Sequence, residues 1–219
     1  MVALARFTAE SKTWSLQESP QNTLSKTRRI ASAWDTIGWI LYSQGKIAEA
    51  ETYIQSAWAN RETAEIGEHL AEIAEGKGNR DDALRLCELA MATFPKYLRP
   101  SVRKVPGATQ VELSEHIEAL RKAGANEPAA DPDDTLQQLR TISLGSSSGF
   151  TGSAEYRLLL GNGKVVDFQK IGAKDVPLAR EKLDAAQLPS YWPKGSEAQL
   201  VRNAMLNCHA GICELVFEP

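Results

Sequence analysis

Cysteine and histidine are the side chains of this chain best suited to chemistry, and there are three of each. Cys208 and Cys213 lie close together near the C-terminal end, with His209 beside the first. They allow three interpretations: a cross-strand disulfide, two free and partly buried thiols, or a metal site that includes His209. A closed zinc site needs four ligands, and a fourth is missing from this neighbourhood. Three cysteines are too few for a disulfide framework, yet this pair is spaced closely enough to bond.

The histidines His69, His116 and His209 are scattered, and none has a sequence context that would pair a nucleophile with a base. The sequence contains no Gly-rich phosphate loop, no HExxH and no GxSxG motif. Gly161-Asn162-Gly163 is expected to join two strands rather than open a helix, so it is a turn and not a nucleotide-binding motif. We therefore expect no catalytic residue, no metal and no cofactor, and we interpret the chain as non-enzymatic.

The composition is that of an ordinary globular protein with two parts. The chain has 219 residues, of which 42% are hydrophobic, which is enough for one full core or two small ones. A formal net charge of -3 and a pI of about 5.7 give no basis for binding nucleic acid or an anionic membrane through bulk charge. No stretch approaches the roughly 18 apolar residues of a membrane helix, and residues 1–7 are too short for a signal-peptide core. We expect no nucleic acid partner and no membrane insertion.

A repeat with a period of 33 residues sets the expected architecture of the N-terminal part. The landmarks of residues 31–63 recur in residues 64–96: Ala31 with Ala64, Ile37 with Leu70, Gly45 with Gly78, Ala50 with Ala83, Ile54 with Cys87, and Ala57 with Ala90. This pattern resembles the tetratricopeptide repeat (TPR), in which small residues let two antiparallel helices approach closely. The second copy is degenerate, since Gly67 replaces the bulky residue and Ala71 the small glycine. The resemblance places Cys87 at a packing position, buried and unreactive.

Two repeats are fewer than such arrays normally need, so other segments must cap them. We expect an N-terminal capping segment at 1–30 and a capping helix from about Thr109 to Ala123, which extends the TPR-like region over 31–123. Residues 124–134 are rich in proline, alanine and acidic side chains, which favours a linker. The alternative is that the chain is a piece of a longer array.

The TPR resemblance implies a concave groove lined by the first helix of each repeat. The groove positions are Ser32, Asp35, Trp39, Tyr42 and Ser43 in the first repeat, and Glu65, Glu68, Glu72, Glu75 and Gly76 in the second. The four glutamates form either a solvated acidic helix face or a binding surface for a basic peptide, with Trp39 and Tyr42 as aromatic anchors. Asp35, Trp39, Tyr42 and the four glutamates are therefore the candidate partner-binding residues.

Periodicity changes after residue 134 from helical to alternating, which predicts a small α+β domain over 135–219. The expected strands are 139–144, 154–160, 165–171, 200–208 and 213–217. Between the third and fourth strands we expect a helix that is capped by Asp175 and ended by Pro189. Its expected buried face is Val176, Ala179, Leu183 and Ala186. A three-residue loop at 161–163 would pair Leu158 with Val166 and Tyr156 with Phe168. In the last hairpin, Cys208 opposite Cys213 would pair Leu206 with Leu215 and Ala204 with Phe217.

From Ser32 onward the chain resembles the C-terminal portion of large bacterial envelope proteins in which a transglutaminase-like region precedes TPR repeats. The residues that carry the resemblance are Trp34 to Ile40, Glu68 to Ile73, Arg140 to Leu144, Ser153 to Tyr156, and the Cys208 and Cys213 pair. The last domain resembles a TonB C-terminal-type module. The resemblance implies a periplasmic or envelope location; the transglutaminase-like catalytic Cys, His and Asp have no counterpart here, and Val201-Arg202-Asn203-Ala204 departs from the Arg-Arg-Gly of the pattern.

The sequence therefore leads to one main hypothesis and two alternatives. The main hypothesis is a scaffold whose TPR groove binds another protein or a basic peptide. The first alternative is the non-catalytic end of a transglutaminase-like envelope enzyme, and the second is thiol redox chemistry at Cys208 and Cys213.

Overall fold

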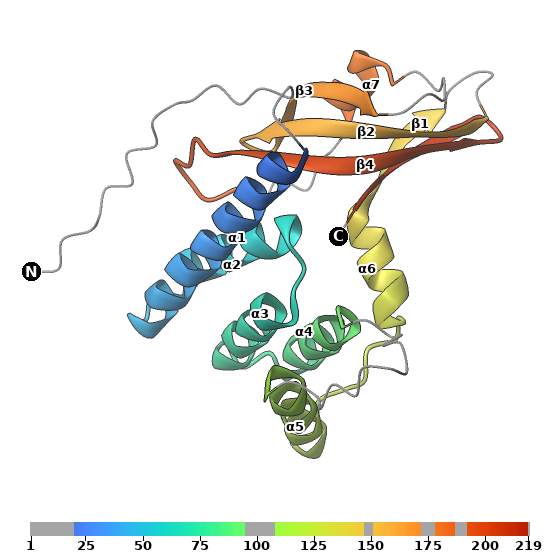
Figure 1. Cartoon of the computed structure of the whole chain (residues 1–219). Coiled ribbons are helices and arrows are strands. Elements are labelled where there is room, and N and C mark those ends of the chain that lie inside the picture. The colour runs from blue at the N-terminus through green and yellow to red at the C-terminus, as the bar shows by residue number, and fades with distance from the viewer. Residues whose placement is uncertain (1–19, 95–107, 147–150, 172–177, 187–191, 219) are drawn as a thin grey trace, which may run out of the picture.

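The computed structural model describes residues 20–94, 108–146, 151–171, 178–186 and 192–218. Its helical part comprises α1 (Pro20–Ser43), α2 (Ile47–Asn60), α3 (Ala64–Gly76), α4 (Arg80–Ala92), α5 (Ala108–Lys122) and α6 (Pro132–Arg140). The remaining elements are β1 (Thr141–Ser146), β2 (Gly152–Gly161), β3 (Lys164–Ile171), α7 (Arg180–Ala185), β4 (Gln199–His209) and β5 (Ile212–Phe217). The fold is α+β, with helices followed by an antiparallel sheet, as the sequence indicated (Figure 1).

Helices α1 to α5 pack mainly on their neighbours in the chain, α1 on α2, α2 on α3, α3 on α4 and α4 on α5. Gly45 and Gly78 lie just beyond the ends of α1 and α3 with φ of 76° and 80°, a left-handed conformation that glycine adopts without strain. Lys46 N donates to Leu41 O (3.0 Å) and Asn79 N to Ala74 O (2.9 Å), so the same closing bond recurs in both turns. The two turns are separated by the 33-residue period.

Close approach of α1 and α2 depends on Gly38. A Cβ atom at this position would lie 2.4 Å from Ile54 Cγ1 and 3.0 Å from Ala50 O, closer than real side chains allow. Ile37, an internal landmark of the first repeat in the sequence, is instead 41% exposed, whereas the aligned Leu70 is buried. Helix α3 is packed between α2 and α4, but no described helix precedes α1.

The five strands form one sheet in the order β1-β5-β4-β2-β3, and α7 lies on the face away from the helical part (Figure 1). The register of the β4–β5 hairpin was predicted correctly: Cys208 is opposite Cys213, Leu206 opposite Leu215 and Ala204 opposite Phe217. The turn is tighter than the expected four-residue loop, because His209 also pairs with Ile212 and only Ala210-Gly211 remains between them.

The predicted register of the β2–β3 hairpin is wrong. Leu158 lies opposite Phe168 rather than Val166, and Tyr156 lies opposite Lys170 rather than Phe168. Gly161 pairs with Lys164, so the loop is the two residues Asn162-Gly163, both with positive φ as a type I′ turn requires. The register then shifts after Leu160, where a bulge leaves Val166 unpaired and 45% exposed. The bulge places the apolar residues of the two strands on one face of the sheet. The sequence led to the same alignment with a three-residue loop instead.

Some element boundaries also differ from the expectation. Helix α6 begins at Pro132, inside the stretch expected to be a linker, because Asp131 Oδ1 accepts a hydrogen bond from Asp133 N (2.8 Å) and Pro132 occupies the first turn. Strand β1 consequently starts at Thr141, two residues later than predicted. Ala179 is the residue that precedes α7, while Asp175, Val176, Pro189 and Pro95 lie outside the described residues.

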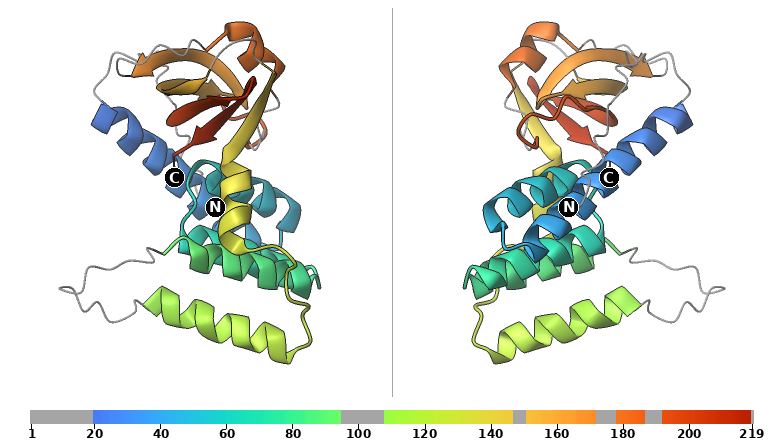
Figure 2. Two further views of the ribbon diagram at one scale, coloured as in Figure 1. Left: turned by 90° about the vertical axis from the view of Figure 1, so that its right-hand side faces the viewer. Right: turned by 90° about the vertical axis from the view of Figure 1, so that its left-hand side faces the viewer.

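The helical part and the sheet are joined by specific contacts. Thr27 of α1 is buried, its Oγ1 donates to Val201 O (3.0 Å), and it accepts from Val201 N (2.9 Å). The pairing of β5 with β4 ends at Ala204, before Val201 is reached. The Thr27 hydroxyl therefore bonds to the backbone groups of Val201 that a neighbouring strand would otherwise pair with. Trp34 of α1 packs edge-on against Trp192, with ring centroids 5.2 Å apart. Figure 2 shows α6 running from the helical part to the sheet, and Arg140 at its end pairs with Glu62.

Candidate functional site

The glutamates selected from the sequence lie on one side of α3, between α1 and α5. Glu68 and Glu72 are half-buried and Glu65 and Glu75 are exposed. Helix α5 adds Glu112, whose charge acts on Glu68. We call the surface formed by Trp39, Tyr42, Glu65, Glu68, Glu72, Glu75 and Glu112 the acidic groove, after the groove that the TPR resemblance predicts.

The wall of the acidic groove on α1 is built around His69. His69 Nδ1 lies 2.8 Å from Asp35 Oδ1, and its ring is stacked on that of Trp39 with centroids 4.2 Å apart. Trp39 in turn stacks on Tyr42 at 5.2 Å, and Tyr42 Oη donates to Glu72 O (3.3 Å). Asp35 is only 7% exposed. Asp35 therefore orients His69 and is not available as a direct contact for a ligand.

The surroundings of His69 favour its protonated form. Burial, the largest influence, lowers the pKa of His69, but the hydrogen bond and charge of Asp35 and the charges of Glu65 and Glu72 outweigh it and raise the pKa above its ordinary value. Because the raised pKa belongs to the folded state, the Asp35 pairing stabilises the fold below the ordinary pKa of about 6.5 and loses this contribution as the pH rises through the raised value.

Negative charge in the groove is poorly compensated. The pKa of Glu68 is raised by burial and then by the charges of Glu112 and Glu72, against the smaller opposing influence of His69 and His116. No ion pair joins Glu65, Glu68, Glu72 or Glu112 to a basic side chain within the described part of the chain. The nearby cation Arg121 is engaged elsewhere, with Glu88 at 2.8 Å and Glu127 at 2.5 Å.

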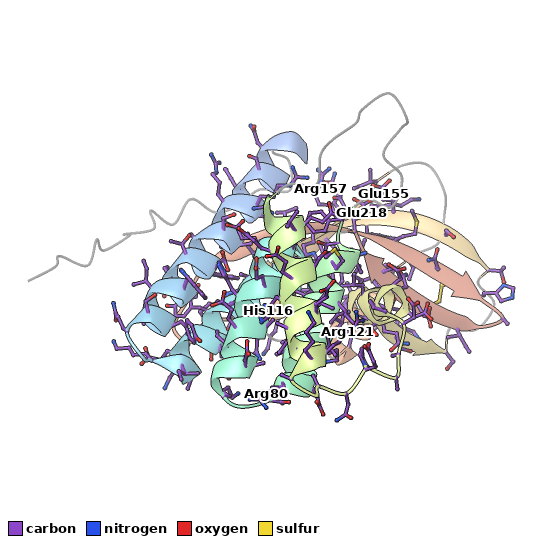
Figure 3. The ribbon with its side chains drawn as sticks, turned by 90° about the horizontal axis from the view of Figure 1, so that it is seen from below. Arg80, His116, Arg121, Glu155, Arg157 and Glu218 are labelled. Carbon is purple, nitrogen blue, oxygen red and sulfur yellow. A yellow bond between two sulfur atoms is a disulfide. The ribbon has the colours of Figure 1, made fainter. Side chains whose placement is uncertain are left out.

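A second cluster, which sequence reasoning missed, connects α3, α4 and α5. His116, which Figure 3 labels on α5, has its Nε2 2.9 Å from Glu75 Oε2 and its Nδ1 3.6 Å from Cys87 Sγ. The order Cys, His, Glu is that of a nucleophile, a base and an orienting carboxylate. Cys87 is 0% exposed, however, and burial followed by the charges of Glu68 and Glu75 raises its pKa to about 12. The thiol therefore has neither access to a substrate nor thiolate character.

We expect Cys87 to be unreactive toward a thiol-specific disulfide reagent in the native protein at pH 8. One thiol should react after denaturation without reductant, and three after reduction. A cysteine introduced at exposed Ser114 on α5 is the matched control and should react within minutes in the folded state. Rapid reaction of native Cys87 would show that the cluster opens to solvent.

The other cysteines are joined to each other. Cys208 and Cys213 form a disulfide across the β4–β5 hairpin with their Cα atoms 4.1 Å apart, and each is 4% exposed. The described ranges contain no group of three or more His, Cys, Asp or Glu side chains able to hold a metal ion. In those ranges no helix is both long and apolar enough to cross a bilayer.

Comparisons with protein-family models, curated proteins and solved structures found no match to this chain.

Proposed function

We propose that the acidic groove binds a basic segment of another protein, so that the chain acts as an interaction scaffold with TPR-like helical hairpins. The proposal is carried by one observation: Glu65, Glu68 and Glu72 of α3 and Glu112 of α5 gather beside the stacked rings of Trp39 and Tyr42, and no ion pair joins these four carboxylates to a basic side chain of the described residues. Like charges held close together cost free energy in the unbound protein, and a cationic ligand would relieve this cost.

The aromatic wall gives the groove a second type of contact. Trp39 and Tyr42 are half-buried, and their stacking with His69 fixes the ring positions before a ligand arrives. Rigid aromatic groups of this kind commonly anchor protein ligands at low entropic cost. Lysine and arginine side chains suit such a wall, because their aliphatic stems pack on rings while the charged ends reach carboxylates.

The proposed scaffold is placed in the cell envelope, following the resemblance to the C-terminal portion of envelope proteins with a transglutaminase-like region. The disulfide between Cys208 and Cys213 supports an oxidising compartment. The disulfide leaves this pair without a free thiolate. The redox alternative therefore requires a disulfide that is reversibly reduced.

Charge reversal in the groove tests the proposal. A fluorescent decapeptide of alternating lysine and alanine is titrated with the full chain, and Glu68→Lys or Glu72→Lys is expected to weaken binding about tenfold, equivalent to about 1.4 kcal/mol. Wild-type affinity should also fall as salt rises from about 20 mM to about 300 mM, because partly exposed charges are screened.

Glu118→Lys provides the matched control, because it makes the same charge change two residues beyond His116, on the opposite side of α5. Its affinity should stay within about twofold of wild type. Equal weakening by Glu118→Lys would assign the binding to overall charge, and absence of peptide binding by the wild type would refute the proposal.

A further inference from the structure

His69 of α3 is a titratable group inside the wall of the acidic groove. Its side chain is 18% exposed, and its imidazole contacts the carboxylate of Asp35 and stacks on Trp39 with an angle of 16° between the ring planes. Glu65 and Glu72 lie about one helical turn away on either side of it in α3. A histidine in this position can change the charge of the groove near neutral pH, because its ordinary pKa is about 6.5.

The contact with Asp35 decides which nitrogen of His69 titrates. Asp35 is buried, and a buried carboxylate is costly unless it accepts a hydrogen bond, so Nδ1 keeps its proton and donates it to Asp35 Oδ1 in both protonation states. Nε2 has no hydrogen-bond partner among the described residues, and it is the atom that gains a proton as the pH falls. Protonation therefore adds one positive charge to the groove wall while the contact with Asp35 remains.

The titratable and charged groups around this side of α3 belong to the first five helices and their ends. They are Asp35 and Tyr42 of α1, Arg61 after α2, Glu65, Glu68 and Glu72 of α3, Cys87 of α4, and Glu112 and His116 of α5. Burial lowers the pKa of His69, but Asp35, and then Glu65 and Glu72, raise it by more than burial lowers it. His69 therefore loses its proton above about pH 6.5.

We propose that His69 makes the binding of a basic segment depend on pH, so that the segment binds more tightly when His69 is neutral. This role rests on the proposed function of the acidic groove. Protonated His69 places a positive charge beside the carboxylates that hold the ligand, and this charge repels lysine and arginine. The imidazolium also attracts the face of the Trp39 ring, whose centroid is 4.2 Å from that of His69, and so competes with a cationic ligand for it. Rising pH removes both effects.

The test is the affinity of the full chain for the lysine and alanine decapeptide at about pH 6 and about pH 8.5, at constant salt. A pH-insensitive fluorophore on the N terminus and an amide at the C terminus leave only lysines, which stay protonated at both values. Wild-type affinity should rise about threefold with pH, as expected for one partly exposed charge. His69→Gln keeps an N–H group for Asp35 but cannot gain a proton, and it should lose most of this rise. His209→Gln, on the exposed end of β4, should keep it.

Histidine NMR resonances measure the same coupling from the other side, because proton binding and peptide binding must affect each other equally. Saturating peptide should lower the pKa of His69 by about 0.5 and leave that of His209 unchanged. The chain has three histidines, so His116→Gln and His209→Gln assign the signals even if His69→Gln does not fold.

Two results would overturn this role of His69. An equal rise of affinity in the wild type and in His69→Gln would assign the pH dependence to another group, such as Glu68. An unchanged His69 pKa on saturation with peptide would show that the proton and the ligand are not coupled. Both results leave the proposed function intact, since the peptide still binds, whereas absence of binding at both pH values would refute the proposed function and the role of His69 with it.

Discussion

Thr27→Val is expected to lower the free energy of unfolding by about 3 kcal/mol, although valine has nearly the same shape as threonine. The hydroxyl both donates to Val201 O and accepts from Val201 N, and Thr27 is buried. Valine would leave two backbone groups of β4 without partners and out of reach of water, and each such group costs roughly 1 to 3 kcal/mol. Denaturant unfolding, followed by circular dichroism and tryptophan fluorescence, measures the change.

Thr27→Ser is the control, because it keeps the hydroxyl and removes only a methyl group. The serine variant should lose about 1 kcal/mol. If valine and serine have equal effects, packing rather than the paired hydrogen bonds holds α1 to the sheet.

Gly38→Val is expected to cost about 3 kcal/mol by forcing α1 away from α2. The Cβ alone would lie 2.4 Å from Ile54 Cγ1, and Ile54 is fully buried, so it cannot move aside freely. Thermal unfolding should show a lower midpoint. Thr36→Val places the same residue on an exposed part of the same helix and should change stability by less than about 0.5 kcal/mol. Similar midpoints for the two variants would mean that the helices separate at little cost.

Local sequence signals were sufficient where a single periodicity determined the structure. The glutamates of α3 share one face because a helix repeats every 3.6 residues, and the β4–β5 register follows from alternation on both sides of a short turn. The β2–β3 register failed because a bulge changes the pairing after the turn, and no residue type marks Val166 as the extra one. Helix α6 was missed although Asp131-Pro132 is a recognisable start signal, since composition alone favoured a linker.

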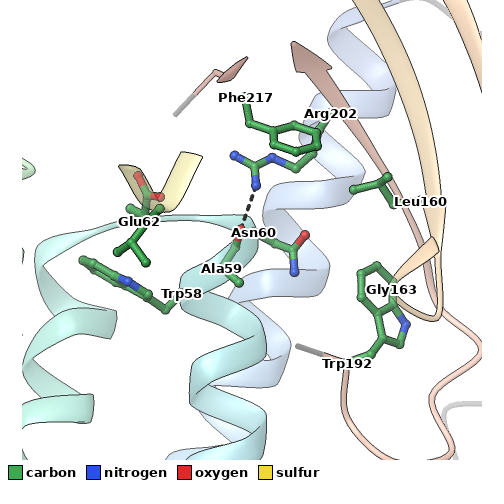
Figure 4. A pocket seen from close by; sticks show the side chains of 10 residues that line it. Trp58, Ala59, Asn60, Glu62, Leu160, Gly163, Trp192, Arg202 and Phe217 are labelled. Carbon is green, nitrogen blue, oxygen red and sulfur yellow. Dashed lines mark hydrogen bonds between the residues drawn. The ribbon is translucent and has the colours of Figure 1, made fainter. Parts of the chain in front are cut away.

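Residues brought together over long distances could not be predicted from one sequence. His116 and Glu112 lie beside the face of α3, but they belong to a helix that begins 44 residues after Ala64. The 33-residue repeat does not extend to that helix, so it could not predict their positions. The pocket between the end of α2 and the sheet is lined by Trp58 and Arg202, which are far apart in the chain and follow no common pattern (Figure 4). Asp35 lies beside the groove, but its burial and its pairing with His69 depend on a neighbouring helix.

The order of strands in the sheet constrains how the protein folds during synthesis. Consecutive strands β1 and β2 do not touch, because the β4–β5 hairpin lies between them. The helices can pack as they emerge from the ribosome, since their contacts join neighbours in the chain. The sheet, in contrast, lacks β4 and β5, which lie between β1 and β2, until residues 199–217 are made. A nascent chain halted before residue 199 would hold a folded helical part beside unpaired strand edges, and such edges are prone to aggregate or to recruit chaperones.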